Sequence, residues 1–458
     1  MTISRSTWTA LGLLLLAHVI LASVFATITP YRQSGLVTLN RSVEKDIGAP
    51  DERQHANYVA RLLNGEGFPV FNPKDPNLYE TYQAHQPPLF YIVAAGFAKV
   101  TGVNDPTDAE TGGRLRFLNV ILGAIVVAGV FFLGKNLQLP EPAIIAATAF
   151  AALLPMNLAL SGALSNDPLL FALCTWTLVG LADGSRNGWN IKRAVTVGVL
   201  IGLACLTKTT ALALLPVAFL ALVLPGEHRP GIRDAGIALV LPILIAGGWW
   251  LRNLNLYGDP FAIRAFSEAF QGSAQKEMFV TQIIPSQSPE ANPELEYWTR
   301  WVGWWTVRSF YGVFGYMDIW MTQSGRQSPD FEQNRLYWVL ILVGTVGLAG
   351  GLFQAARDKE NRNPSVFLVA FAALIGLLFL RFNNQYFQAQ ARYLLPALAP
   401  IAIWIGSGYS AIMKSRANLA VVVVAIPLLL ANAFAISRLP GEFSARIEAG
   451  RVPESQQP

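Results

Sequence analysis

Charged residues are scarce in this sequence. Asp, Glu, Lys and Arg make up 14% of its 458 residues, whereas soluble proteins have about 25%. Hydrophobic residues make up 53%, and long apolar runs recur from one end to the other. This composition excludes an ordinary soluble protein and predicts an all-α polytopic membrane protein in contact with the lipid bilayer. The net charge of +5 then reflects cations that orient helices, so nucleic acid is not an expected partner.

Cysteines, histidines and nucleotide motifs are also scarce. The two cysteines, Cys174 and Cys205, lie inside apolar runs. We therefore expect packed, reduced thiols, and neither a disulfide nor a cysteine metal site. The sequence has no P-loop or other nucleotide motif, which predicts a protein without a nucleotide cofactor. Of the four histidines, His55 and His85 fall in one polar stretch beside an acidic pair.

The apolar runs predict eleven transmembrane helices. The first run is long enough to cross a bilayer and has no small-residue cleavage site near its end, so we interpret it as a retained helix and not as a signal peptide. The run from Pro88 to Val100 has about thirteen residues where a crossing needs about twenty, so we expect it to lie on the outer surface. The predicted spans are 8–29, 115–134, 139–160, 168–183, 194–206, 209–224, 235–251, 336–353, 364–380, 394–411 and 417–436.

The positive charges predict the orientation of these spans. With the N-terminus inside, most Lys and Arg residues of the short turns face the cytoplasm, as positive residues do in membrane proteins. The outer turn from Ser161 to Asn166 has neither residue, although Arg381 and Arg392 share one outer turn. The protein is therefore expected in the inner (plasma) membrane, with its long loops facing the periplasm or outside. The inner cations are Lys135, Arg186, Lys192, Arg193, Arg229, Arg233, Arg357, Lys359, Arg362, Lys414 and Arg416.

The first outer loop, residues 30–114, holds most of the candidate chemistry. The stretch from Asp51 to Asn64 reads as a short amphipathic helix that begins after Pro50 and carries its acidic pair in the first turn. Asp51 and His55 are four residues apart, so both project from the same face of this helix. The loop returns to the membrane through His85 and the residues that follow it.

Three carboxylates are candidate catalytic groups. Asp51, Glu52 and Asp167 all fall on the predicted outer face, where a carboxylate can act as a general base. The alternative for Asp51 and Glu52 is a solvated acidic pair, and the alternative for Asp167 is an ordinary helix start before Pro168. A divalent metal held by His55, His85 and Asp51 is a further hypothesis. Its alternative is a pair of polar loop histidines that form hydrogen bonds.

Four cations at the outer ends of the spans are candidate phosphate ligands. Lys208 lies in an otherwise apolar hairpin, where a lysine is costly unless it pairs or reaches the interface. Guanidinium groups suit phosphate, and an anionic lipid headgroup is a natural partner for the whole set. Interfacial positioning alone is the alternative for each residue. The four candidates are Arg114, Lys208, Arg252 and Arg392.

The chain divides into four predicted parts. Residues 1–251 form a catalytic transmembrane module, and residues 336–436 form the last helices. Between them, residues 252–335 form a second outer loop rich in Trp and Tyr, which suit a membrane interface or a sugar-stacking surface. Residues 437–458 are polar, carry two prolines, and are predicted to be a loose tail.

Several motifs along the chain resemble one superfamily. Pro50-Asp51-Glu52 and the segment from His85 to Tyr91 look like the first outer loop of the GT-C glycosyltransferases. The closest branches are the protein O-mannosyltransferases and the lipid A aminoarabinose transferases. The further matches are Arg114, Asn166-Asp167-Pro168, Leu206-Thr207-Lys208, Trp250-Leu251-Arg252-Asn253, Tyr257-Gly258-Asp259-Pro260 and Arg392-Tyr393-Leu394-Leu395-Pro396.

This resemblance implies a fold and a reaction. The fold would be a GT-C bundle of about eleven transmembrane helices, with interfacial helices in the first loop. The activity would be inverting transfer of a sugar from a polyprenyl-phosphate donor to a lipid, glycan or protein acceptor at the outer face. A transporter or flippase of an envelope precursor is the alternative, although its charges are expected near the middle of the bilayer. A non-catalytic envelope scaffold is a third hypothesis.

The resemblance also assigns roles to residues. Asp51 would be the base, and Lys208, Arg114 and Arg392 would bind the donor phosphate. We expect His55, Tyr82 and Tyr91 to contact substrate or acceptor. His85 stands where the aminoarabinose transferases have a metal-binding glutamate, so the ligand type differs at that position.

Overall fold

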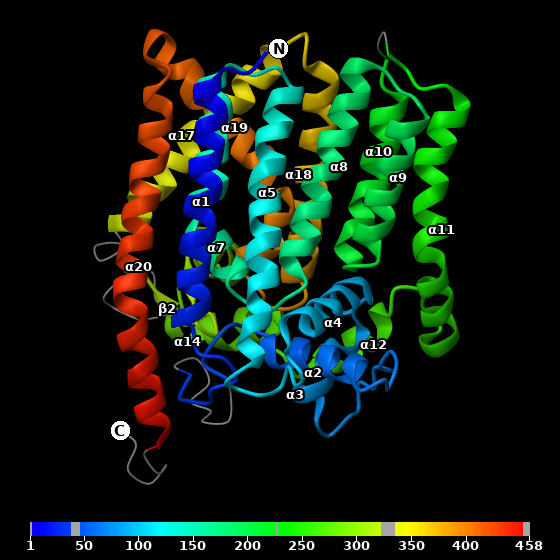
Figure 1. Ribbon diagram of the computed structural model, residues 1–458. Helices are drawn as coiled ribbons and strands as arrows, with labels where there is room; N and C mark the ends of the chain where they lie inside the picture. Colours follow the sequence, from blue (N-terminus) through cyan, green and yellow to red (C-terminus); the bar gives the residue numbers. More distant parts are fainter. Residues whose placement is uncertain (1, 38–45, 226–227, 322–334, 452–458) are drawn as a thin grey trace.

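The computed structural model describes residues 2–37, 46–225, 228–321 and 335–451. A bundle of long helices stands over a layer of short helices at its lower end (Figure 1). The bundle consists of α1 (Arg5–Ile28), α5 (Arg116–Asn136), α6 (Glu141–Leu153), α7 (Pro155–Ser161), α8 (Asp167–Asn187), α9 (Ile191–Cys205), η3 (Thr209–Ala213), α10 (Leu214–Val223), α11 (Ile232–Tyr257), α17 (Arg335–Arg357), α18 (Arg362–Asn383), η7 (Ala391–Tyr393), η8 (Leu395–Ala397), α19 (Leu398–Met413), η9 (Lys414–Arg416) and α20 (Leu419–Arg451).

The predicted all-α membrane architecture is confirmed, but the count of eleven spans is not established. Among the described residues, eight helices are long and apolar enough to cross a membrane, or up to nine if the bent pair α6 and α7 is one span. Each predicted span coincides with one or more helical segments. However, α9 has 15 residues and α10 has 10, short of the roughly twenty that a crossing needs. Helix α1 begins at the upper end of the bundle and α20 ends at the lower end (Figure 1), so an odd number of crossings joins these two points.

The predicted span 139–160 is one of the points where the structure differs from the sequence-based prediction. Its two halves, α6 and α7, are bent by 55° at a break before Pro155. Proline lacks an N–H group, so the helical hydrogen bonds cannot continue across the break. The carbonyl groups freed by the break accept hydrogen bonds from side chains instead, from Asn157 to Ala151 (2.9 Å), from His18 to Ala152 (3.0 Å) and from Asn432 to Leu153 (2.8 Å).

The layer at the lower end is built from the two long loops. Helix α4 packs on α2 there (Figure 1), where Tyr58 and Tyr91 stack with ring centroids 3.7 Å apart. The run from Pro88 to Val100 therefore lies beside the loop helices, as its length suggested. The elements are α2 (Glu52–Leu63), α3 (Leu78–Thr81), η1 (Tyr82–His85), α4 (Leu89–Thr101), η2 (Gly112–Leu115), α12 (Ile263–Ala269), η4 (Phe270–Gly272), α13 (Lys276–Met278), η5 (Phe279–Ile283), α14 (Ile284–Gln287), α15 (Pro293–Glu296), η6 (Tyr297–Gly303), α16 (Trp304–Tyr311), β1 (Val313–Phe314) and β2 (Ile319–Trp320).

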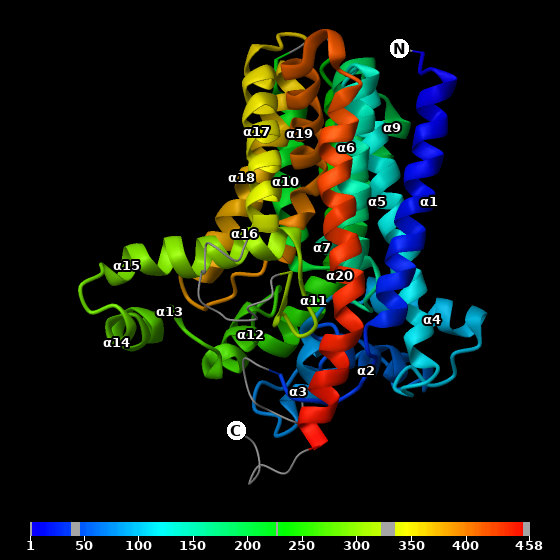
Figure 2. The same cartoon turned by 90° about the vertical axis from the view of Figure 1, so that its left-hand side faces the viewer.

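The second outer loop forms an arm that projects to one side of the bundle (Figure 2). Helical segments 276–287 and 293–311 make up this arm, and each contains a π-helical stretch. The base of the arm pairs with the turn between α18 and α19. The Lys276 amide donates to the Gln385 carbonyl (3.1 Å), and the Phe387 amide donates to the Ala274 carbonyl (2.7 Å). This pairing fixes the second loop against the turn that carries Arg392.

The C-terminal stretch corrects another expectation. The predicted loose tail begins at residue 437, but α20 continues as a helix to Arg451, past Pro440. Glu442 forms ion pairs with Arg438 and Arg446, one turn away on either side, and these pairs support the helix. Arg446 also bonds Asp318 beside β2, with Nε and Oδ2 3.0 Å apart. Residues 452–458 of the predicted tail lie outside the described residues.

Candidate active site

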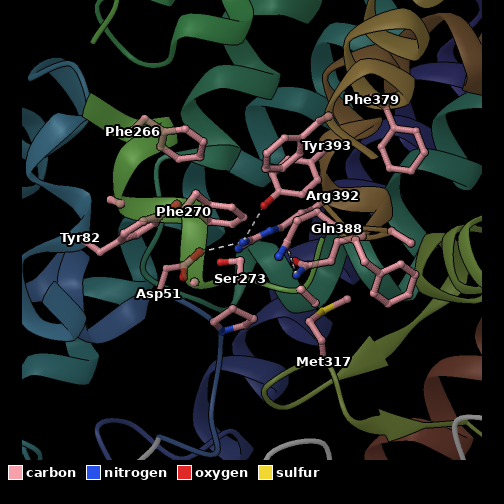
Figure 3. A pocket seen from close by; sticks show the side chains of 18 of the residues that line it. Asp51, Tyr82, Phe266, Phe270, Ser273, Met317, Phe379, Gln388, Arg392 and Tyr393 are labelled. Carbon is pink, nitrogen blue, oxygen red and sulfur yellow. Dashed lines mark hydrogen bonds and ion pairs between the residues drawn. The ribbon is translucent and has the colours of Figure 1, made fainter. Parts of the chain in front are cut away.

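A cavity of about 1290 Å³ opens at the lower end of the bundle. It draws its lining from three of the four predicted parts of the chain, which are the first outer loop with the turn after α9, the second outer loop, and the turn between α18 and α19. Figure 3 shows Asp51 and Arg392 pointing toward one another across it, with Phe266 and Phe270 nearby. Segments that are hundreds of residues apart in the sequence therefore share one chamber.

Asp51 stands at the rim of this cavity, immediately before α2. Its φ angle of +63° is left-handed, a conformation that Asp tolerates better than most residues, and its side chain makes no capping hydrogen bond. The carboxylate is thus free to reach across to Arg392, whose Nη2 lies 2.7 Å from Oδ2. Burial is the largest single effect and raises the pKa of Asp51, but the charges of Arg392, His55 and Lys208 and the hydrogen bond from Arg392 together outweigh it and lower the pKa below the usual value. Asp51 is therefore ionised at neutral pH.

Arg392 is held in place by its backbone. The Ala391 amide in η7 donates to the Ser309 hydroxyl of α16 at 2.8 Å. The Arg392 side chain also donates from Nη2 to the Tyr393 hydroxyl at 3.2 Å. Its Nε is buried without a hydrogen-bond partner in the described structure. A guanidinium group with one unmatched donor in a cavity is suited to an anionic ligand.

Asp167 and Lys208 form the second ion pair of the site. Lys208 lines the cavity, and its Nζ lies 2.5 Å from Asp167 Oδ1. Asp167 sits behind the lysine and does not itself line the cavity, since only 4% of its side chain is exposed. Asp167 is also the first residue of α8, where its negative charge interacts favourably with the positive end of the helix dipole. Asp167 is therefore placed to orient Lys208 and not to meet a substrate.

Glu52, the neighbour of Asp51, points into the protein. Arg116 binds it with two hydrogen bonds, of 2.7 Å from Nε and 2.5 Å from Nη2. The Leu164 amide donates to the same carboxylate at 2.8 Å. Arg116 also donates to the carbonyl groups that end α1, so Glu52 ties three segments together. With both oxygens bonded and only 4% of its side chain exposed, Glu52 is a structural residue and is not available as a base.

The histidines do not form the predicted metal site. His55 is buried beneath the cavity, with Nδ1 2.9 Å from the Tyr91 hydroxyl, and neither residue lines the cavity. His85 lines it, but its Nδ1 donates to the Tyr82 carbonyl (2.7 Å) and its Nε2 faces the Gln86 amide (3.0 Å). The described residues contain no group of three or more His, Cys, Asp or Glu that could hold a metal. His55, His85 and Asp51 therefore do not come together as one group of metal ligands in the described part of the chain.

Both histidines are neutral in this setting. Burial lowers the pKa of His55 to about 3, against the opposing effect of the Asp51 charge. Burial also lowers the pKa of His85 to about 4. Tyr82 lies between His85 and Phe270 with its ring in the cavity wall. Tyr82 and His85 can therefore contact a ligand, whereas His55 and Tyr91 form a supporting layer beneath Asp51.

Two of the four predicted phosphate ligands lie elsewhere. Arg114 is exposed to solvent in η2, outside the cavity lining. Arg252 lies on α11, donates to the Pro69 carbonyl at 2.7 Å and stacks on Trp249. It too is outside the cavity lining. Only Lys208 and Arg392 bring positive charge into the chamber among the predicted set.

Comparisons with known proteins identify the fold. Residues 85–250 match the sequence model of the dolichyl-phosphate-mannose–protein mannosyltransferase family. The structure resembles the Archaeoglobus fulgidus oligosaccharyltransferase tethered with an acceptor peptide, with a TM-score of 0.53 and 15% identity over 92% of this chain and 55% of that one. The chain has the GT-C fold. No curated protein matches the sequence.

Other solved structures give similar values. A complex of the same oligosaccharyltransferase with Zn and sulfate has a TM-score of 0.51 and 15% identity, over 92% of this chain and 53% of that one. ArnT from Cupriavidus metallidurans, bound to undecaprenyl phosphate, has a TM-score of 0.49 and 13% identity, over 96% of this chain and 79% of that one. The chain spans about half the length of the oligosaccharyltransferase chains that it matches.

The cavity also has lining residues that the sequence analysis missed. Tyr393, Gln388 and Gln390 line the chamber beside Arg392. Tyr393 follows Arg392 directly in the motif that ends at Pro396, so its position near the cavity could be inferred from the sequence. The two glutamines carry no such signal, because they lie in an irregular turn whose direction depends on contacts with Asn383 and Ser309.

Much of the rest of the chamber is lined by apolar and aromatic groups, beside polar residues such as Gln54, Gln86 and Thr209. Its wall reaches α18, a helix long and apolar enough to cross a membrane, where Leu378 and Phe379 line the cavity. An apolar wall that continues to a membrane-facing helix suits a hydrocarbon chain. Trp301, Trp305 and Tyr316 of the predicted aromatic loop belong to this wall. The other members are Phe261, Ile263, Phe266, Phe270, Phe279, Ile283, Phe379, Phe382 and Phe387.

Proposed function

We propose that this protein is an inverting glycosyltransferase that moves a sugar from a polyprenyl-phosphate donor to an acceptor. The observation that carries the proposal is the cavity itself, in which Asp51, Lys208 and Arg392 meet beside an apolar wall that continues to α18. A lipid-linked phosphate has matching parts, namely an anionic group and a hydrocarbon chain. The GT-C fold supports the same reaction class.

The proposed reaction is a single displacement at the anomeric carbon. The acceptor oxygen or nitrogen forms a bond to this carbon while the bond to the phosphate oxygen breaks, and the electron pair of that bond leaves with the lipid phosphate. Lys208 and Arg392 stabilise the charge that develops on the leaving phosphate. Asp51 accepts the acceptor's proton, because it is the ionised carboxylate that lines the cavity among the three candidates. Attack from the face opposite the phosphate inverts the anomeric centre.

The proposal places this chemistry at the outer face of the inner membrane. Its support is the charge bias of the short turns, whose positive residues mark the cytoplasmic side. The catalytic unit consists of residues 1–251 together with the turn that carries Arg392. Residues 252–335 would cover the cavity and contact the acceptor, which is a lipid, glycan or protein. Residues 336–436 would complete the lipid-facing wall.

Sugar transfer by purified protein in detergent tests the proposal. The donor is a synthetic polyprenyl phosphate carrying a radiolabelled sugar, and acceptors are supplied as an envelope extract. Lys208→Ala and Arg392→Ala should each reduce donor binding and transfer by at least tenfold, because charge-assisted hydrogen bonds to phosphate are strong. Arg114→Ala is the matched control, since this arginine is exposed outside the cavity. Undiminished donor binding in both cavity variants would contradict the phosphate role.

A further inference from the structure

The two cations of the cavity are already occupied by carboxylates of the protein. Asp51 bonds Arg392 at 2.7 Å, and Asp167 bonds Lys208 at 2.5 Å. The side chains of Arg392 and Lys208 are 9% and 16% exposed, so these pairs are shielded from bulk water. Shielding makes each pair stronger than a surface ion pair. An incoming anion must therefore compete with the protein's own carboxylates.

The geometry of Arg392 shows where the competition occurs. Guanidinium groups bind phosphate best through two neighbouring N–H groups that contact two oxygens. Here Nε has no partner, whereas Nη2 is shared between Asp51 and Tyr393. A phosphate that used the Nε and Nη2 edge would find one donor free and the other engaged by Asp51. Binding in this mode must displace a contact of Nη2, and Asp51 is the partner that competes with phosphate, because its carboxylate is an anion that neutralises the same charge.

We propose that the phosphate group of the ligand exchanges with the Asp51 carboxylate on Arg392. In the ligand-free protein Asp51 neutralises the arginine, and in the complex the phosphate takes its place and leaves Asp51 free to face the acceptor. This inference rests on the proposed function, in which Arg392 binds a lipid-linked phosphate. Asp51 is then available as a base only when the phosphate of the donor is bound. In the empty site Asp51 stays paired with Arg392.

The exchange predicts that removing the Asp51 charge strengthens phosphate binding. Asp51→Asn keeps the side-chain shape, and Asn tolerates the left-handed backbone angle at this position. The apparent affinity of the wild type is the intrinsic affinity multiplied by the fraction of molecules in which Arg392 is free of Asp51. With that fraction at about a tenth, the variant should bind about tenfold more tightly. If Asp51 had only a structural role, Asp51→Asn would bind phosphate more weakly than the wild type or not at all.

The measurement is calorimetric titration of detergent-solubilised protein with three probes, which are a polyprenyl phosphate, inorganic phosphate and the matching polyprenol. Asp46→Asn is the control variant. Its carboxylate also pairs with an arginine of the first loop, Arg53, at 2.7 Å, but lies outside the cavity lining. Asp51→Gly, which also tolerates the left-handed backbone angle and removes the carboxylate, provides a second test should Asp51→Asn fold poorly. Thermal melting of each variant reports folding.

Tighter binding of polyprenyl phosphate by Asp51→Asn or Asp51→Gly, with Asp46→Asn unchanged, supports the exchange. A parallel gain in affinity for inorganic phosphate assigns the exchange to the phosphate headgroup. The affinity for polyprenol should be the same in all variants. Equal affinity in the wild type and both cavity variants overturns the inference while leaving the proposed function intact. An equal gain in Asp46→Asn also overturns it, because net charge would then be the cause. Failure of every protein to bind polyprenyl phosphate overturns both.

Discussion

Asp51 and Glu52 are adjacent in the sequence, yet their side chains serve different purposes. Asp51 faces the cavity, whereas Glu52 bonds Arg116 inside the protein. We expect Asp51→Asn to reduce sugar transfer by about a hundred- to ten-thousand-fold, the usual loss for a general base, while donor binding persists. The assay is transfer from a synthetic polyprenyl-phosphate donor. Retention of more than about a tenth of wild-type turnover would remove Asp51 from the role of base.

Glu52→Gln should instead affect stability. The substitution leaves the Arg116 guanidinium, which is 2% exposed, without its counterion. Removing one partner of a buried ion pair typically costs about 3–5 kcal/mol. We expect a clear drop in the melting temperature in detergent, measured by tryptophan fluorescence. A variant that melts like the wild type but has lost transfer activity would show that Glu52 acts in catalysis.

The buried His55 predicts how stability depends on pH. Burial lowers its folded pKa from about 6.5 to about 3, with the Asp51 charge opposing and the Lys208 charge assisting this shift. Below pH 6.5 the unfolded chain therefore binds a proton that the folded chain does not. The free energy of unfolding should fall as the pH drops from 6.5 toward 3, by up to about 1.4 kcal/mol per pH unit from this residue.

Comparison of two histidine variants checks this expectation. His55→Gln keeps a group that can bond the Tyr91 hydroxyl and removes the titration, so its stability should change less steeply between pH 6.5 and 4 than that of the wild type. His228→Gln, at an exposed histidine in the turn before α11, is the matched control. Identical slopes for wild type and His55→Gln would show that His55 is protonated in the folded protein.

At the scale of elements, the break between α6 and α7 helps to position residues of the candidate site. Helix α7 and the turn after it bring the Leu164 amide to Glu52 and the start of α8 to Lys208. The break is sustained partly by Asn432 of α20, which donates to the Leu153 carbonyl. Asn432→Leu should destabilise the protein by about 1–3 kcal/mol, the usual cost of a buried unpaired polar group. Thermal unfolding measures this loss, and Asn432→Gln should recover part of it.

At the scale of the whole molecule, the charge bias predicts which end of the bundle faces the cytoplasm. Lys192 begins α9 at the upper end and Ser444 lies on α20 at the lower end, and both are exposed. A cysteine at Lys192 should be protected from an impermeant thiol reagent in intact cells, whereas one at Ser444 should be labelled. Cys174 and Cys205 are buried free thiols, so background labelling should be low. The reverse labelling pattern would show that the lower end of the bundle, with the cavity, faces the cytoplasm.

The sequence by itself determined the membrane class, the positions of the helices and the two loops that form the lower layer. Apolar run length, proline position and charge bias are local properties, and local properties can be read without a structure. The same reasoning identified Asp51, Lys208 and Arg392 as members of a larger candidate set. It could not separate these residues from Arg114, Arg252 and Glu52, which have the same chemistry.

Only the tertiary structure decided which candidates meet. The Asp51–Arg392 contact joins residues 341 positions apart, and no local pattern encodes a separation of that length. The orientation of Glu52 depends on the end of α1 and on the turn after α7, both of which surround Arg116. The hydrogen bonds of both His85 ring nitrogens, to Tyr82 and Gln86, likewise depend on neighbours that only the folded chain puts in place. Packing of distant segments selects the active side chains, because burial and pairing are properties of the folded chain.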